Sequence, residues 1–239
     1  MEKIRILVWD LPVRVFHWLL AISFAGAYVT SGYDGLRYLH VTFGYTVAVL
    51  IAFRLIWAII GTRYARLSSF RYGPQAVRDY LGSLLARRPR HYLGHNPAGS
   101  WAIYAIVTLG IFTTATGYAR YNHLTGKWIG EVHQVAGNVM LGIVTAHIAG
   151  VLVSSFLHRE NLAKAMLTGY KSGHPEQAIR TTRWMTAVLL AGFIAAFWSG
   201  AVEIPGFPRT HALKAGARNA TVVRSERGDR QHESRERGS

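Results

Sequence analysis

The residues of this chain best suited to chemistry are two histidines within one long apolar segment. His133 and His147 are fourteen residues apart. On an α-helix this interval is just under four turns, so both imidazole rings lie on the same face, about 21 Å apart along the axis. Because the hydrocarbon core of a bilayer is about 30 Å thick, one ring is expected near each face of a membrane.

Two further histidines lie at the ends of earlier apolar segments, His17 in the first and His40 in the second. Neutral imidazole is a suitable axial ligand for haem iron, and ionisable residues inside membrane helices are costly and usually functional. Four histidines at two depths therefore predict two bis-histidine sites, the ligand set for two haem b groups. For any single histidine the alternative is a hydrogen bond to a neighbouring helix.

The expected depths determine the pairs. With a cytoplasmic N-terminus, His17 and His147 lie near the inner face, and His40 and His133 lie near the outer face. The first pair is predicted to hold the iron of an inner haem and the second the iron of an outer haem. With both axial positions filled, no site is open to oxygen or substrate, so the expected chemistry is electron transfer.

Other residues near these histidines are predicted to help bind the cofactor. Gly44 and Gly137 each follow a histidine by four residues, which leaves room for a flat macrocycle, although small residues also simply let membrane helices pack. Arg54 lies fourteen residues after His40 and either pairs with an inner haem propionate or extends to the membrane surface. Arg14 and Arg120 are similar propionate partners at the inner and outer sides.

The elements that would position these residues are five nearly uncharged segments, each long enough to span a bilayer. The sequence therefore predicts an all-α integral membrane protein, a transmembrane four-helix di-haem bundle plus a fifth transmembrane helix. Residues 1–204 form this domain, and residues 205–239 form a basic tail that should be disordered. The predicted spans are about 15–32, 40–61, 99–120, 133–156 and 183–202.

Shorter features surround the spans. Asp10 and Pro12 suit the start of the first helix, and residues 73–87 suit a short amphipathic helix at the membrane surface. His95 and His158 either line a proton or quinone route or are solvated.

The distribution of charge predicts the orientation. The chain has 27 Lys and Arg against 12 Asp and Glu, a formal charge of +15. Residues 62–98 contain seven Arg and one acid, Asp79, and the connection between the fourth and fifth spans is also basic, whereas the other two connections are nearly neutral. This alternation follows the positive-inside rule, so it places the N-terminus in the cytoplasm and argues against nucleic acid as the partner.

The chain has no cysteine. Disulfides, iron–sulfur clusters, thiolate ligation of haem and covalent attachment of c-type haem are therefore excluded.

Several motifs together resemble bacterial cytochrome b561 and the b-type cytochrome subunits of nickel–iron hydrogenases, over about residues 5–200. The resemblance implies a four-helix di-haem core with an extra helix and electron exchange with the quinone pool. It also implies His17, His40, His133 and His147 as ligands. The motifs are Val8–Trp18, His40-x-x-x-Gly44, Phe53–Trp57, Arg90–Gly99, and His133…His147 followed by Leu157–Asn161.

The favoured function is electron transfer across the bacterial inner membrane, in which the chain is multi-pass. The electrons would pass between quinone and an external c-type cytochrome or oxidoreductase such as hydrogenase. One alternative is a membrane oxidoreductase that itself reacts with a small species such as superoxide and with quinone. Another is a non-redox membrane anchor. An electron-transfer subunit is favoured over a stand-alone enzyme, membrane lipid is a further partner, and an oligomer is compatible with the sequence.

Overall fold

The computed structural model describes residues 3–88, 90–202 and 204. The chain divides into two compact units, Met1–Ile194 and Ala195–Ser239. The functional residues predicted above all belong to the first unit. The predicted tail, residues 205–239, lies outside the described residues.

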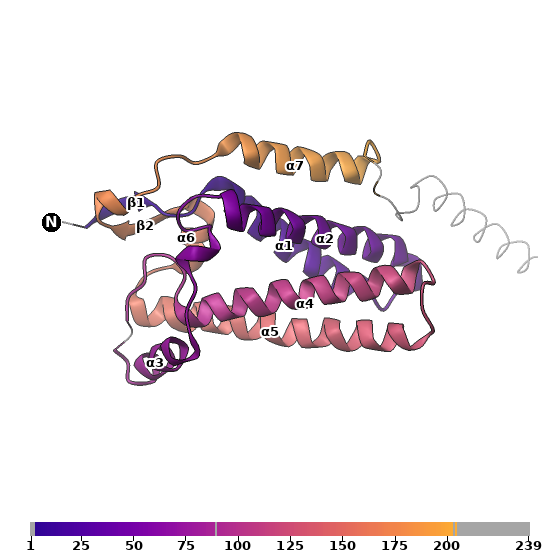
Figure 1. The fold of residues 1–239 in the computed structure, drawn as a ribbon, viewed down its shortest axis with the longest axis horizontal. Coiled ribbons are helices and arrows are strands. Elements are labelled where there is room, and N and C mark those ends of the chain that lie inside the picture. Colours follow the sequence, from indigo (N-terminus) through magenta and orange to yellow (C-terminus); the bar gives the residue numbers. More distant parts are fainter. Residues whose placement is uncertain (1–2, 89, 203, 205–239) are drawn as a thin grey trace, which may run out of the picture. The chain divides into compact units, whose positions relative to one another are not determined.

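Four long helices make up the bundle of the first unit. They are α1 (Leu11–Thr30), α2 (Arg37–Ile60), α4 (Pro97–Tyr121) and α5 (Trp128–His158). Among the described residues, these four are long and apolar enough to cross a membrane. They run alongside one another in Figure 1, where α1 packs on α2, α2 on α4, and α4 on α5. The predicted all-α membrane bundle is therefore confirmed.

The helices begin where the sequence supplies caps. Asp10 accepts a hydrogen bond from the backbone nitrogen of Val13 at 2.9 Å, as expected for the start of α1. Asn96 does the same for Gly99 at 2.7 Å, and Pro97 is tolerated in the first turn. Helix α5 begins at Trp128, five residues before the predicted span, because the predicted bounds followed apolar residues rather than the helix start.

The fifth apolar helix, α7 (Trp184–Ser199), is shorter than the other four. Its 16 residues rise about 24 Å, less than the hydrocarbon thickness of about 30 Å. Within the first unit, Leu190 and Ile194 of this helix pack against Phe16 and Leu50. That α7 spans the membrane stays a prediction.

The connection from α2 to α4 and the connection from α5 to α7 lie at the same end of the bundle (Figure 1). They contain the 3-10 turns η2 (Leu67–Ser69) and η3 (Pro175–Gln177) and the short helices α3 (Pro74–Leu85) and α6 (Leu162–Thr168). Helix α3 confirms the predicted amphipathic helix, and its Tyr80 is buried. At the opposite end, η1 (Asp34–Leu36) joins α1 to α2, and residues 122–127 join α4 to α5.

A two-stranded antiparallel sheet at the first of these ends was not predicted from the sequence. Strand β1 (Ile4–Leu7) pairs with β2 (Tyr170–Gly173), with Ile4 opposite Gly173. We call this the sheet end of the bundle and the opposite end the turn end. Gly169 ends α6 in a left-handed conformation (φ 88°), and its carbonyl accepts hydrogen bonds from the backbone nitrogens of Val8 and Trp9. A Cβ there would lie 2.8 Å from the Trp9 carbonyl oxygen, so glycine is required.

Asp10 links the start of α1 to the end of α2 through hydrogen bonds. Its carboxylate is 1% exposed, and besides capping α1 it accepts hydrogen bonds from Trp57 Nε1 at 3.1 Å and Thr62 Oγ1 at 2.6 Å. A buried carboxylate is tolerated when its oxygens are satisfied in this way. The start of α1 is thereby fixed to the end of α2, which positions His17.

Candidate cofactor site

His40 of α2 and His133 of α5 face each other at the turn end. Their ring centroids are 6.0 Å apart and the ring planes are inclined at 87°. A bond between a metal and an imidazole nitrogen is about 2 Å long, so two rings that share one metal ion have centroids about 6 Å apart. The separation of His40 and His133 therefore fits a shared iron.

Backbone carbonyls orient both of these rings. His40 Nδ1 donates to the carbonyl oxygen of Ala27 at 2.8 Å, and His133 Nδ1 donates to that of Thr113 at 2.9 Å. Because a carbonyl can only accept, Nδ1 of each neutral ring carries the proton and Nε2 keeps its lone pair. Such a second hydrogen bond is the usual way in which proteins orient a metal-binding histidine.

Gly117 makes room for His133 and was not found from the sequence. A Cβ at this position would lie 2.8 Å from Cε1 of the His133 ring. Gly117 is four residues after Thr113, so it faces the same side of α4. The available signal was the glycine itself, because glycine within a helix costs about 1 kcal/mol relative to alanine and needs a reason.

The two glycines predicted from the His-x-x-x-Gly spacing border open space. Apart from the glycine's own helix turn, no atom of the described residues lies within 4 Å of a Cβ built on Gly44 or on Gly137. The helices do not pack closely there, so helix packing does not explain these glycines. Open space beside each histidine fits a flat macrocycle, although the role of both glycines stays a prediction.

His17 of α1 and His147 of α5, the second predicted pair, lie toward the sheet end. They are close enough for their charges to interact. His17 Nδ1 is buried and has no hydrogen-bond partner among the described residues. Within the described residues, no group of three or more His, Asp or Glu could hold a metal ion. The paired histidines therefore fit two-ligand haem sites better than a tetrahedral metal site.

The three arginines predicted to contact propionates lie in different environments. Arg54 is only 5% exposed, so it does not extend to the surface. Its Nη1 donates to the carbonyl of Ala65 at 3.0 Å, and its guanidinium lies 5.6 Å from the ring centroid of Phe70. Arg14 Nη1 donates to the Leu167 carbonyl at 2.6 Å, and its Nε is buried without a partner among the described residues. Arg120 is exposed.

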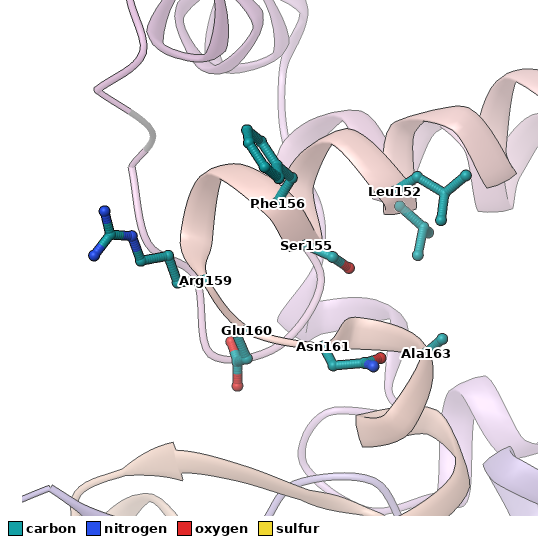
Figure 2. Close-up of a pocket in the computed structure, with 8 residues that line it drawn as sticks. Leu152, Ser155, Phe156, Arg159, Glu160, Asn161 and Ala163 are labelled. Atoms are coloured by element: carbon teal, nitrogen blue, oxygen red, sulfur yellow. The ribbon is translucent and has the colours of Figure 1, made fainter.

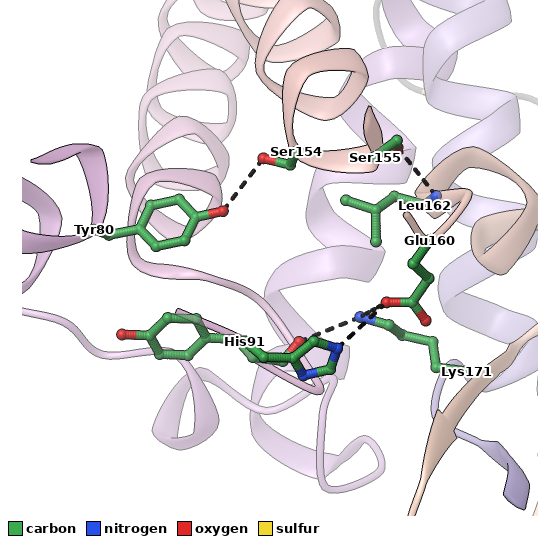
Figure 3. A network of polar contacts seen from close by, with 8 residues as sticks. Tyr80, His91, Ser154, Ser155, Glu160, Leu162 and Lys171 are labelled. Carbon is green, nitrogen blue, oxygen red and sulfur yellow. Dashed lines mark hydrogen bonds and ion pairs between the residues drawn. The ribbon is translucent and has the colours of Figure 1, made fainter. Parts of the chain in front are cut away.

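A polar network joins three segments at the sheet end: the one after α3, the one after α5, and strand β2 (Figure 3). Lys171 Nζ of β2 lies 3.3 Å from the Glu160 carboxylate and donates to the Tyr92 carbonyl at 3.2 Å. His91 Nε2 lies 3.7 Å from the same carboxylate. Burial lowers the pKa of Lys171, and Glu160 opposes that shift. Burial also lowers the pKa of His91, and Lys171 adds to the lowering.

A groove of about 400 Å³ lies beside this network, where α5 ends (Figure 2). Its lining combines the apolar Leu152 and Phe156 with the polar Ser155 and Asn161. Leu152 and Phe156 are 64% and 83% exposed, so one wall of the groove faces outward. Val151 is the first lining residue in the sequence, and it follows His147 by four residues, about one helical turn. This groove was not predicted from the sequence.

Membrane-spanning helices that carry paired histidines in their interior define the class of membrane b-type cytochromes. The chain belongs to the prokaryotic cytochrome b561 family, whose model matches residues 8–169. It is accordingly a multi-pass membrane protein of electron transport, and a b-type cytochrome binds haem b.

Curated relatives agree with this membership. A "Probable Ni/Fe-hydrogenase B-type cytochrome subunit" of Rhizobium leguminosarum bv. viciae is 24% identical over 214 residues, which cover 70% of this chain and 89% of the relative. The "Probable Ni/Fe-hydrogenase 1 B-type cytochrome subunit" of Escherichia coli K12 is 25% identical, covering 69% and 90%. A similarly described protein of Azotobacter chroococcum mcd 1 is 28% identical over 158 residues, covering 53% and 65%. No solved structure matches the chain.

Proposed function

We propose that the chain is a di-haem b-type cytochrome that transfers electrons across the bacterial inner membrane, between quinone and an external oxidoreductase. The observation that carries the proposal is the arrangement of His40 and His133. Their rings are 6.0 Å apart, and each Nδ1 is held by a helix carbonyl. Haem b supplies one-electron redox chemistry when it is bound.

The residues of the chain confine the reaction to electron transfer. His40 and His133 would hold one iron at the turn end, and His17 and His147 would hold the other toward the sheet end. Two axial histidines leave no coordination position for oxygen or substrate. The two ligands on α5 are about 21 Å apart along the helix, so the two sites together bridge most of the bilayer.

Quinone is the proposed partner at the sheet end, and the groove supports this. An isoprenoid quinone has an apolar tail and a polar ring, which match the outward-facing Leu152 and Phe156 and the polar Asn161. Ser155 lies about 12 Å beyond His147 along α5, a short distance for electron exchange. By the charge rule this end is cytoplasmic, so protons for quinone reduction would come from the cytoplasm.

The proposed external partner is an oxidoreductase, and hydrogenase is favoured because the relatives are described as hydrogenase cytochrome subunits. An external c-type cytochrome is the second possibility for the same position. Either would exchange electrons with the turn-end pair, which the charge rule places outside.

Addition of a short-chain quinol to the purified, oxidised protein tests this function. The proposal expects reduction of haem b, followed in the absorption spectrum, and loss of that reduction in Leu152→Trp, which fills the groove. Gly142→Trp is the control, because Gly142 also borders open space but does not line the groove. Protein without haem would indicate an anchor, and quinol-insensitive haem that is reduced by superoxide would indicate the enzyme alternative.

A further inference from the structure

His95 lies in the connection between α3 and α4, and two aromatic rings hold it. Its ring centroid is 4.6 Å from that of Trp9 and 4.8 Å from that of Phe70, at inclinations of 57° and 56°. These contacts come from two segments far apart in the sequence, the one before α1 and the one after η2. The orientation of the imidazole is therefore fixed by packing.

One nitrogen of the His95 ring is buried without a hydrogen bond to any described residue. His95 Nδ1 is buried and has no hydrogen-bond partner among residues 3–88, 90–202 and 204. Leaving a buried polar atom unsatisfied is costly, and such atoms in native proteins normally have a partner. Burial, with help from Arg54, lowers the pKa of His95 to about 3. The ring is thus neutral, with one nitrogen as donor and the other as acceptor.

The surroundings favour an anionic partner. The groups whose charges act on His95 are all basic: Arg54, Lys171, His147 and His17. Arg54 is itself buried, and its hydrogen bond goes to the neutral Ala65 carbonyl. The acid whose charge acts on Arg54 is Asp10, and the Asp10 carboxylate already accepts hydrogen bonds from Val13, Trp57 and Thr62. A carboxylate in this position would accept a hydrogen bond from His95 and compensate the guanidinium, as buried charges require.

The cofactor proposed for the sheet end carries such carboxylates. His95 packs against Trp9, in the segment just before α1 that carries His17, and the charges of His17 and His147 act on it. We propose that His95 is a cofactor-binding residue, whose Nδ1 donates a hydrogen bond to a propionate of the haem held by His17 and His147, with Arg54 as the charge partner. This inference rests on the proposed di-haem function.

Four variants of the full-length holoprotein test the role of His95. His95→Phe keeps an aromatic ring between Trp9 and Phe70 but removes the nitrogens. Gln and Met have similar sizes, but only Gln can donate, so His95→Gln and His95→Met form a matched pair. His91→Phe is the control in the same connection, because His91 contacts Glu160 instead.

The readouts are transfer of haem to apomyoglobin, the midpoint potential of each haem, and the propionate bending modes in resonance Raman spectra. A hydrogen bond to a charged group corresponds to about a tenfold effect or more. We expect His95→Phe and His95→Met to lose one of the two haems about tenfold faster, with a lower potential for that haem and a shifted propionate mode. His95→Gln and His91→Phe should stay close to the wild type.

Equal behaviour of the Gln and Met variants would overturn the inference, and this comparison holds even if His95→Phe fails to fold. Unchanged haem transfer in the Phe variant would mean that the ring only packs. If the wild-type protein bound two haems and the His95 variants were unaffected, the role of His95 would be refuted while the proposed function would stand. Wild-type protein without haem would refute the proposed function itself.

Discussion

The imidazole rings of His40 and His133 stand nearly perpendicular to each other, with their centroids 6.0 Å apart. Each ring donates its Nδ1 proton to a carbonyl of a different helix, α1 for His40 and α4 for His133. All four long helices therefore contribute to this one pair. A substitution in any of these helices near the pair should therefore alter the binding of a cofactor there.

Gly117 provides the first test of that dependence. In Gly117→Ala the new Cβ would lie 2.8 Å from the His133 ring, so the ring must move and its bond to the Thr113 carbonyl is disturbed. We expect the variant to lose most of one haem and keep the other, as measured by pyridine haemochrome assay. Gly142→Ala is the control, because a Cβ there meets nothing within 4 Å. Full haem content in Gly117→Ala would mean that His133 does not bind haem in this orientation.

Substitutions of Gly44 and Gly137 test whether a cofactor fills the open space beside these glycines. A leucine at either position meets no protein atom close to its Cβ, so the polypeptide itself should tolerate it. We expect Gly44→Leu and Gly137→Leu to accumulate in the membrane but to lack the turn-end haem, because the side chain occupies the space of the macrocycle. Normal haem spectra in both variants would show that no macrocycle occupies the space beside these glycines.

The bundle could be predicted from the sequence because membrane helices are recognised by their length and apolar content. It also predicted two histidine pairs, because the fourteen-residue interval between His133 and His147 fixes both face and depth on one helix. The rings of His40 and His133 lie 6.0 Å apart, and haem ligation by both pairs stays a prediction. Helix bounds were less accurate. The cap Asn96 lies before the apolar run of its helix, and the helical turn before His133 contains the charged Glu131, so both fell outside the predicted spans.

Long-range contacts at the sheet end could not be predicted. Strands β1 and β2 have four residues each and are separated by more than 160 positions. The polar Lys171 and Ser172 of β2 carry no strand pattern. Likewise, neither the Lys171–Glu160 contact nor the aromatic packing of His95 follows from local periodicity, since both depend on how the connections fold together.

The Lys171–Glu160 ion pair should stabilise the sheet end. The Lys171 side chain is 4% exposed and that of Glu160 is 20% exposed, so removal of one partner leaves a poorly solvated charge. We expect Lys171→Met to reduce stability by about 2–3 kcal/mol, between the values for exposed and buried pairs. The double variant Lys171→Met/Glu160→Gln should recover part of this loss. Thermal unfolding in detergent measures both, and strictly additive effects would show that the two residues do not interact.

His91 should make stability depend on pH. Its pKa is lowered, chiefly by burial and then by Lys171, so the folded protein disfavours the protonated ring. Both states bind no proton at His91 above its ordinary pKa of about 6.5. As the pH falls below that value the unfolded state takes up the proton first, and stability declines until the folded pKa is passed. The melting temperature should therefore fall between about pH 7 and about pH 5, and less steeply in His91→Gln. Equal slopes for the two proteins would exclude His91 as the cause.

The most direct test of the account is the number of haem b groups bound by the purified chain. Pyridine haemochrome assay combined with amino-acid analysis gives the ratio of haem to polypeptide. Two histidine pairs, His40 with His133 and His17 with His147, predict two haems per chain. They also predict a low-spin spectrum, because both axial positions of each iron are filled. A ratio of one, a high-spin spectrum or no haem would contradict it.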